Sequence, residues 1–204
     1  MDIKFIEKNT DAKIEYYKEI TSTSECAKVL AEEMVKSMQI TNKESGQTIE
    51  KNIKDIRVII SEKQTNGKGT NGRVWLSSDK ENILMTLIIF PHMKANELQG
   101  ITYSIAEMIK AAIKDLYDIS LDIKLPNDLL LNEKKICGIL TESSIQNNKV
   151  KYLLIGIGFN VNQLEFSNEI INIATSLKKE NKDKAFSREE IIVKIINNVK
   201  SLVK

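Results

Sequence analysis

The strongest constraint on the fold comes from four short apolar runs that follow one another closely along the chain. They span residues 121–125, 129–131, 136–142 and 152–161. Turn-forming dipeptides such as Pro126-Asn127 and Asn132-Glu133 separate them, and such short connections favour antiparallel pairing. Further β-like runs lie at residues 13–20, 56–60 and 83–90. Because strands and helices do not alternate regularly, the order predicts an α+β fold, with a mostly antiparallel or mixed sheet covered by helices.

Three segments have the apolar spacing of amphipathic helices. The first, residues 23–38, follows Ser22-Thr23-Ser24-Glu25, which has the spacing of a capping box. The second and longest spans residues 95–117. The third follows a second capping box, Ser187-Arg188-Glu189-Glu190, and closes the chain. Residues 177–184 form a charged, loop-like cluster, and no repeat or linker divides the chain, so we expect one domain over residues 1–204.

Composition excludes several functional classes. The 30 Lys+Arg and 28 Asp+Glu residues leave a net charge of +2, far from the basic excess of a dedicated nucleic-acid-binding protein. Cys26 and Cys137 belong to no CxxC or Cys/His cluster, so we expect neither a zinc site nor a disulfide framework. His92 is the sole histidine, which leaves little room for His-dependent triad catalysis. Without a long apolar run or a signal peptide, the sequence predicts no membrane association and a cytoplasmic location.

A glycine-rich segment lies between two of the strand candidates. Gly67-Lys68-Gly69-Thr70-Asn71-Gly72 matches G-x-G-x-x-G, the dinucleotide fingerprint, which requires a helix directly behind the glycines. Arg73-Val74-Trp75 and another β-rich run follow instead, which argues against a Rossmann turn. The segment is either an exposed loop between strands or, because Lys68 and Arg73 bring positive charge beside backbone N–H groups, a loop that closes over a phosphate-bearing ligand.

Three further segments carry residue types suited to ligand binding. Lys124-Leu125-Pro126-Asn127-Asp128 groups a lysine, an amide and a carboxylate around a proline, and Asp128 suits Mg²⁺. Lys134-Lys135 leads into an apolar strand containing Gly138, and Gly156-Ile157-Gly158-Phe159-Asn160 places glycines where a ligand or a second backbone approaches closely. Taken singly, each segment is also explained by a plain turn, a solvated lysine pair or a close strand contact.

Taken in order, these segments resemble the catalytic domain of the biotin protein ligases, within the biotin and lipoate protein ligase superfamily. The matching segments are residues 22–24, 64–75, 124–128, 135–142, 156–161 and 174–177. The resemblance implies the class II synthetase-like fold of that domain. It also implies ATP-dependent activation of biotin to biotinyl-5′-AMP, with Mg²⁺, and transfer of biotin to a lysine of a biotin carboxyl carrier protein, as in acetyl-CoA carboxylase. The alternatives are a lipoate or octanoate ligase, and a non-catalytic sensor of biotin or biotinyl-AMP.

The resemblance also implies roles for individual residues. The expected catalytic residues are Lys135, Lys68 and Arg73. The expected biotin-binding residues are Ser22, Thr23, Ser24, Gln64, Lys68, Gly69, Thr70, Lys135 and Gly138. The expected ATP-binding residues are Gly67, Trp75, Lys124, Asn127 and Asn160, and Asp128 is the expected Mg²⁺ ligand.

The chain departs from the family pattern at four positions. Lys68 and Thr70 stand where arginine is common, Leu125 replaces a usual tryptophan, and Ser24 replaces a usual asparagine. Since a charge-assisted contact contributes about 1.5 to 3 kcal/mol, Thr70 predicts weaker retention of biotinyl-adenylate unless another cation substitutes. The short segment before Ser22 and the end of the chain after its closing helix predict neither a DNA-binding nor an SH3-like domain. We therefore expect no specific DNA partner, whereas apolar strand edges make a homodimer reasonable.

Overall fold

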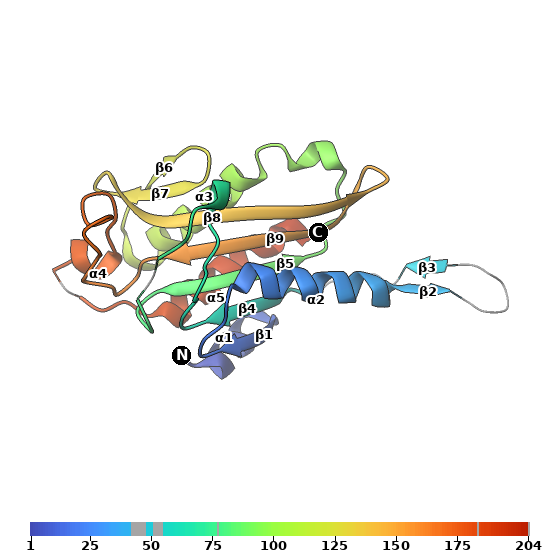
Figure 1. The fold of residues 1–204 in the computed structure, drawn as a ribbon, viewed down its shortest axis with the longest axis horizontal. Coiled ribbons are helices and arrows are strands. Elements are labelled where there is room, and N and C mark those ends of the chain that lie inside the picture. Colours follow the sequence, from blue (N-terminus) through green and yellow to red (C-terminus); the bar gives the residue numbers. More distant parts are fainter. Residues whose placement is uncertain (42–47, 51–54, 77, 183, 204) are drawn as a thin grey trace.

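A seven-stranded mixed sheet lies at the centre of the molecule (Figure 1). The computed structural model describes residues 1–204 except 42–47, 51–54, 77, 183 and 204. In spatial order the strands are β1 (Lys13–Tyr17), β4 (Arg57–Ser61), β5 (Ile83–Ile89), β9 (Lys149–Phe159), β8 (Lys134–Gln146), β7 (Asp128–Leu131) and β6 (Asp122–Lys124). Strands β1 and β4 pair in parallel, and the other neighbours pair antiparallel. The predicted α+β class is confirmed.

Helices cover both faces of the sheet, because successive side chains of a strand point to opposite faces. One face carries α1 (Ile3–Thr10), α3 (Ile101–Tyr117) and α5 (Arg188–Val199), and α2 (Thr23–Met38) lies on the other (Figure 1). In the central strands, Ile60 and Leu87 belong to the larger apolar cluster, on the face that α1, α3 and α5 cover. Ile59 and Ile88 belong to the smaller cluster, which packs against α2. Two apolar cores therefore hold α2 and the other helices to the same sheet.

The shorter elements complete the described chain. They are β2 (Gln39–Thr41), β3 (Thr48–Glu50), η1 (Thr70–Gly72), η2 (Ala95–Leu98), α4 (Leu177–Glu180) and η3 (Lys200–Val203). Strands β2 and β3 form a separate two-stranded sheet that continues from the end of α2 (Figure 1). The charged cluster at residues 177–184 is not all loop, because Leu177 is buried and Ser176 caps the short helix α4.

The helix predictions hold with two differences. The long helix predicted from residue 95 is divided, since Gly100 adopts a left-handed φ of 79° between η2 and α3. The N-terminal helix α1 was not predicted, because it offers only Ile6 as a fully buried apolar residue; the Asp2 side chain caps it by accepting from the Phe5 N–H at 3.0 Å. Among the described residues no helix is long and apolar enough to cross a membrane.

The two predicted capping boxes have different outcomes. Ser187 caps α5 as expected, with its side-chain oxygen accepting from the Glu190 N–H at 3.2 Å. Ser22 does not cap α2, because its Oγ atom is buried and has no hydrogen-bond partner, and Glu25 pairs with Lys68 instead. The serine-rich start of α2 is therefore available for a purpose other than helix capping.

Candidate functional site

A cavity of about 440 Å³ opens between the start of α2, the loop that joins β4 to β5, and one end of β7, β8 and β9. Most of the predicted site residues line it. They are Thr23, Ser24, Gln64, Lys68, Gly69, Thr70, Arg73, Trp75, Lys124, Asn127, Asp128, Lys135, Gly138 and Asn160. Ser22 and Gly67 do not line the cavity, although each is the direct neighbour of a residue that does. The structure thus brings together segments that are more than 100 residues apart in the sequence.

The glycine-rich segment forms a narrow loop over this cavity. The Trp75 N–H donates to the Gly67 carbonyl at 2.8 Å, and the Gly69 N–H donates to the Arg73 carbonyl at 2.8 Å. The η1 turn at its tip contains Asn71 and Gly72, both at positive φ. Arg73 is extended directly after the η1 turn, and no helix begins between Gly72 and β5 among the residues described there, as the sequence predicts.

The indole of Trp75 lies on two glycines of the sheet. Gly138 of β8 and Gly158 of β9 are cross-strand partners. A Cβ atom added to Gly138 would lie 2.8 Å from Trp75, and one added to Gly158 would lie 2.7 Å from the indole Nε1. Both positions therefore require glycine, because any larger residue would push the ring off the sheet. The close approach that glycines inside a buried strand predict is here an aromatic contact at the cavity.

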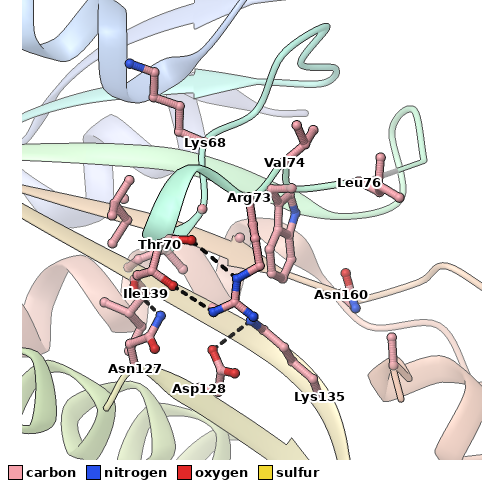
Figure 2. Close-up of a pocket in the computed structure, with 18 of the residues that line it drawn as sticks. Lys68, Thr70, Arg73, Val74, Leu76, Asn127, Asp128, Lys135, Ile139 and Asn160 are labelled. Atoms are coloured by element: carbon pink, nitrogen blue, oxygen red, sulfur yellow. Dashed lines mark hydrogen bonds and ion pairs between the residues drawn. The ribbon is translucent and has the colours of Figure 1, made fainter. Parts of the chain in front are cut away.

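Lys135 and Asp128 form the central ion pair of the site. The Lys135 Nζ lies 2.7 Å from Asp128 Oδ1, with the two side chains 33% and 23% exposed (Figure 2). The same ammonium group lies 5.3 Å from the centre of the Trp75 ring, within reach of a cation–π interaction. The Lys135 backbone is fixed on both sides: its N–H donates to the Ile173 carbonyl, and its carbonyl accepts from Thr175.

The two cations of the glycine-rich loop point in different directions. Figure 2 shows the Arg73 guanidinium held by two hydrogen bonds to Thr70, from Nε to the backbone oxygen at 3.4 Å and from Nη2 to Oγ1 at 3.3 Å. Lys68 instead turns towards α2, where its Nζ lies 2.8 Å from Glu25 Oε1. The hydrogen bond to Glu25 raises the pKa of Lys68. In this arrangement Lys68 is paired with α2, whereas the Arg73 guanidinium is held by Thr70 at the tip of the loop.

Polar side chains also gather at the end of the cavity beside α2. The Gln64 side-chain oxygen accepts from the Thr23 N–H at 2.7 Å and from the Thr23 hydroxyl at 3.1 Å. Thr86 of β5 contacts this group from below, and its hydroxyl lies 2.9 Å from the Thr23 hydroxyl. Thr86 was not predicted as a site residue, although a single hydroxyl in the apolar run of β5 is a usable signal.

Three polar atoms at the cavity are buried without a hydrogen bond. They are Trp75 Nε1, Asp128 Oδ1 and Asn160 Oδ1, and the last belongs to a side chain whose nitrogen donates to the Thr175 carbonyl at 3.0 Å. Asp128 Oδ1 meets the Lys135 ammonium group, but without hydrogen-bond geometry. A buried polar atom left unpaired costs about 1 to 3 kcal/mol, so Trp75 Nε1 and Asn160 Oδ1, which have neither a hydrogen bond nor an ion pair, indicate a polar ligand.

Asn127, an expected ATP-binding residue, also makes hydrogen bonds within the sheet. Its side-chain nitrogen donates to the Ile139 carbonyl at 3.0 Å, and its backbone oxygen accepts from the Ile139 N–H at 2.9 Å. This side chain therefore anchors β8 while it lines the cavity. The structure also adds lining residues that were not predicted as site residues, among them Leu140, Gly156, Ile170, Asn172, Ile173 and Ala174.

Comparison with known proteins places the chain among ligases. A model of the biotin/lipoate A/B protein ligase family matches residues 33–160. The bifunctional ligase/repressor BirA of Bacillus subtilis is 36% identical over 141 residues, which are 68% of this chain and 43% of that protein. The biotin–protein ligase of Homo sapiens is 30% identical over 157 residues, which are 72% of this chain and 21% of that protein. The chain thus spans less than half the length of these relatives.

Solved structures extend the likeness to nearly the whole chain. The biotin protein ligase from Aquifex aeolicus in complex with biotin and ATP matches with a TM-score of 0.66 at 25% identity, covering 94% of this chain and 70% of that chain. The biotin protein ligase from Leishmania major in complex with biotinyl-5-AMP has the same fold, with a TM-score of 0.70 at 21% identity over 94% of this chain and 74% of that one. Since the family model also covers more than half of the sequence, the chain belongs to the biotin/lipoate A/B protein ligase family.

Proposed function

We propose that this chain activates biotin with ATP and transfers it to a lysine of a biotin carboxyl carrier protein. The observation that carries the proposal is the composition of this cavity. It combines a polar end at Thr23 and Gln64 with a cationic region at Lys135 and Arg73, and unpaired polar atoms lie beside that region. Such a site suits a ligand with a hydrogen-bonding head at one end and an anionic group at the other. Biotin joined to adenylate has this layout.

In the first step, a carboxylate oxygen of biotin attacks the α-phosphorus of ATP, and pyrophosphate leaves. Two anions must approach each other, so positive charge at the point of attack lowers the barrier. Lys135 is suited to this role, because its ammonium group lies within the cavity and its backbone is held by residues 173 and 175. Arg73 provides a second cation from the loop above.

In the second step, the neutral amine of a carrier lysine attacks the acyl carbon of the adenylate. AMP leaves, and the attacking nitrogen loses a proton to solvent. The glycine-rich loop and Trp75 border the cavity, which suits them to exclude water from the mixed anhydride before the carrier arrives. Trp75 Nε1 and Asn160 Oδ1 are a donor and an acceptor without partners, as recognition of a nucleotide requires.

Asp128 fits the role of a protein ligand to Mg²⁺. In the part of the chain that the structure describes, no three or more His, Cys, Asp or Glu residues are grouped as a metal site. Mg²⁺ is commonly held by one or two carboxylates together with substrate phosphates and water, so the Asp128 carboxylate at the cavity is sufficient. When bound there, Mg²⁺ would supply positive charge to phosphate oxygens. Asp128 would then exchange part of its contact with Lys135 for the metal.

The test is incubation of the purified chain with biotin, MgATP and an apo carrier domain. Both pyrophosphate release and the intact mass of the carrier are followed. We expect biotin-dependent pyrophosphate and a carrier heavier by one biotinyl group. Replacing biotin with lipoate or octanoate separates the other acyl ligases by the mass added. Biotin binding without pyrophosphate release would indicate a sensor, and would refute the proposal.

A further inference from the structure

The polar end of the cavity continues below its surface as a chain of hydrogen bonds. The Ser24 and Thr86 hydroxyl oxygens lie 3.4 Å apart, those of Thr86 and Thr23 lie 2.9 Å apart, and the Thr23 hydroxyl lies 3.1 Å from Gln64 Oε1. The Ser24, Thr86 and Thr23 side chains are almost completely buried, with exposed fractions of 6%, 0% and 3%. Water therefore has little access to these hydroxyl groups, and the order of donors and acceptors is set by the chain itself.

Chemistry allows only one direction along this chain. The side-chain oxygen of Gln64 can only accept, so Thr23 must use its single hydroxyl hydrogen to donate to it. The Thr23 oxygen then accepts from Thr86, which in turn leaves the Thr86 oxygen to accept from Ser24. Every hydroxyl donates once and accepts at most once. The direction of the relay is thus Ser24 to Thr86 to Thr23 to Gln64.

The relay determines which way the Gln64 amide faces. With Oε1 occupied by the backbone N–H and the hydroxyl of Thr23, the NH₂ group is on the opposite side of the amide. Nε2 lies beside the glycine-rich loop, where a Cβ atom added to Gly67 would be 2.8 Å away. Gln64 lines the cavity, and no acceptor for its NH₂ group is found among the hydrogen bonds of the described residues, so this group keeps its capacity to donate.

The sheet leaves room for the relay at one position. Thr86 of β5 is the cross-strand partner of Gly156 of β9. A Cβ atom added to Gly156 would lie 3.1 Å from Ser24 Oγ, so the absence of a side chain there lets the hydroxyl group settle between α2 and the sheet. The same strand face carries Ile88, which packs in the apolar core against α2. Thr86 is therefore a polar exception on an otherwise apolar face.

We infer that Thr86 is a positioning residue for recognition of the substrate's head group. It acts through Thr23 to hold Gln64 with its NH₂ group ready to donate to a carbonyl oxygen. This inference rests on the proposed function, in which the head group is the cyclic urea of biotin. A urea carbonyl accepts such a bond, whereas the dithiolane of lipoate and the methyl end of octanoate cannot. The buried relay thus favours biotin over the other acyl groups of the superfamily.

The experiment compares Thr86→Val with Thr86→Ser. Valine keeps the shape and removes the hydroxyl group, whereas serine keeps the hydroxyl group and removes the methyl group. Thr102→Val is the matched control, because the Thr102 hydroxyl is paired with Thr141 at 2.7 Å in a position that does not line the cavity. For each protein we would measure KM for biotin, KM for ATP and kcat by pyrophosphate release, and the biotin Kd by calorimetry.

We expect Thr86→Val to raise the KM and Kd for biotin about tenfold, which corresponds to about 1.4 kcal/mol. The KM for ATP and kcat should stay within about twofold, since a binding interaction made equally in the ground and transition states changes KM alone. Thr86→Ser and Thr102→Val should bind biotin within about twofold of the unchanged protein.

Three results would overturn the inference. The first is an unchanged biotin Kd in Thr86→Val. The second is a loss of biotin affinity in Thr86→Ser equal to that in Thr86→Val. The third is a loss of ATP affinity or kcat in Thr86→Val that parallels the loss of biotin affinity, which would indicate a packing role. Failure of the proposed function has a separate signature in the unchanged protein. If that protein binds biotin without releasing pyrophosphate, the ligase proposal fails and the Kd values still decide the role of Thr86. If it does not bind biotin, both fail.

Discussion

Replacement of Lys135 by methionine is the most direct perturbation of the proposed chemistry. Methionine keeps an unbranched apolar stem beside Trp75, whose ring centre lies 5.3 Å from the Lys135 ammonium group, but it removes the charge. Removing one preorganised donor to developing negative charge typically costs about 2.7 to 4 kcal/mol of transition-state stabilisation. We therefore expect Lys135→Met to slow biotin-dependent pyrophosphate release by about 10²- to 10³-fold.

The fold should tolerate this change. The Lys135 and Asp128 side chains are 33% and 23% exposed, so solvent partly screens their ion pair, but Asp128 Oδ1 is buried and loses its cation, and the change should cost about 1 to 3 kcal/mol. The hydrogen bonds that hold residue 135 to Ile173 and Thr175 come from the backbone and do not need the lysine side chain. For a chain of this length each 1 kcal/mol of lost stability lowers the Tm by about 2 to 4 °C.

The assay measures single-turnover pyrophosphate release with biotin and MgATP in excess, together with thermal unfolding. Lys134→Met is the matched control, because Lys134 is the adjacent lysine of β8 and does not line the cavity. We expect its rate to stay within about twofold. A Lys135→Met enzyme with a near-normal rate, or an equal loss in Lys134→Met, would refute the central role of the Lys135 charge.

Three further predictions concern retention of the intermediate, stability and the aromatic contact. Arg73→Met should speed release of biotinyl-adenylate from the isolated enzyme about tenfold, since one charge-assisted contact is lost; an unchanged release rate in rapid filtration would contradict this. Burial alone would raise the pKa of Glu62, but the hydrogen bond and charge of Arg188 outweigh burial and hold this pKa below its usual 4.5. The ionised Glu62 carboxylate therefore stabilises the fold at neutral pH, and this contribution should be lost as the pH falls through the lowered pKa. Urea titrations should show Arg188→Met destabilised by about 3 to 5 kcal/mol near neutral pH, with a weaker acid dependence than the unchanged protein; an equal acid dependence would exclude this pair as its cause. Gly158→Ala should displace the indole of Trp75, the only tryptophan, and shift its fluorescence emission, whereas an unchanged spectrum would argue against the contact.

The sequence predicts the central elements well where a local pattern matches burial on one face. The helix predicted at residues 23–38 coincides with α2, and the four closely spaced apolar runs become β6 to β9. The helix α1 was missed because its eight residues include only one fully buried apolar residue, Ile6, which gives little periodicity, and tertiary contacts of Ile6 decide how the helix packs. Gly100 was placed inside a helix because glycine alone does not reveal its left-handed φ.

The candidate site is predictable for residues that belong to recognisable motifs, and not for residues that act from beneath them. Lys135, Asp128 and Trp75 meet at the cavity as expected. Thr86 was missed because its importance depends on the register of β5 beneath the start of α2, which no local spacing encodes. The orientation of Lys68 towards Glu25 was missed for a similar reason, since it depends on where α2 lies relative to the loop.

The position of Arg73 bears on the substitution of Thr70 for arginine. A threonine at the tip of the loop carries no charge, so the sequence suggests a deficit of positive charge beside the adenylate. In the structure the Thr70 backbone oxygen and hydroxyl both accept from the Arg73 guanidinium, which brings a cation to the neighbourhood of residue 70. These bonds are long, at 3.3 and 3.4 Å, and Arg73 is exposed, so they restrain the guanidinium less firmly than a buried pair would. Through Thr70, Arg73 can therefore supply the missing positive charge. Its guanidinium is held less rigidly than that of an arginine at position 70 itself would be. Retention of the adenylate in this chain should depend on how well the loop orders when substrate binds, and so on the pair formed by Thr70 and Arg73 rather than on either residue alone.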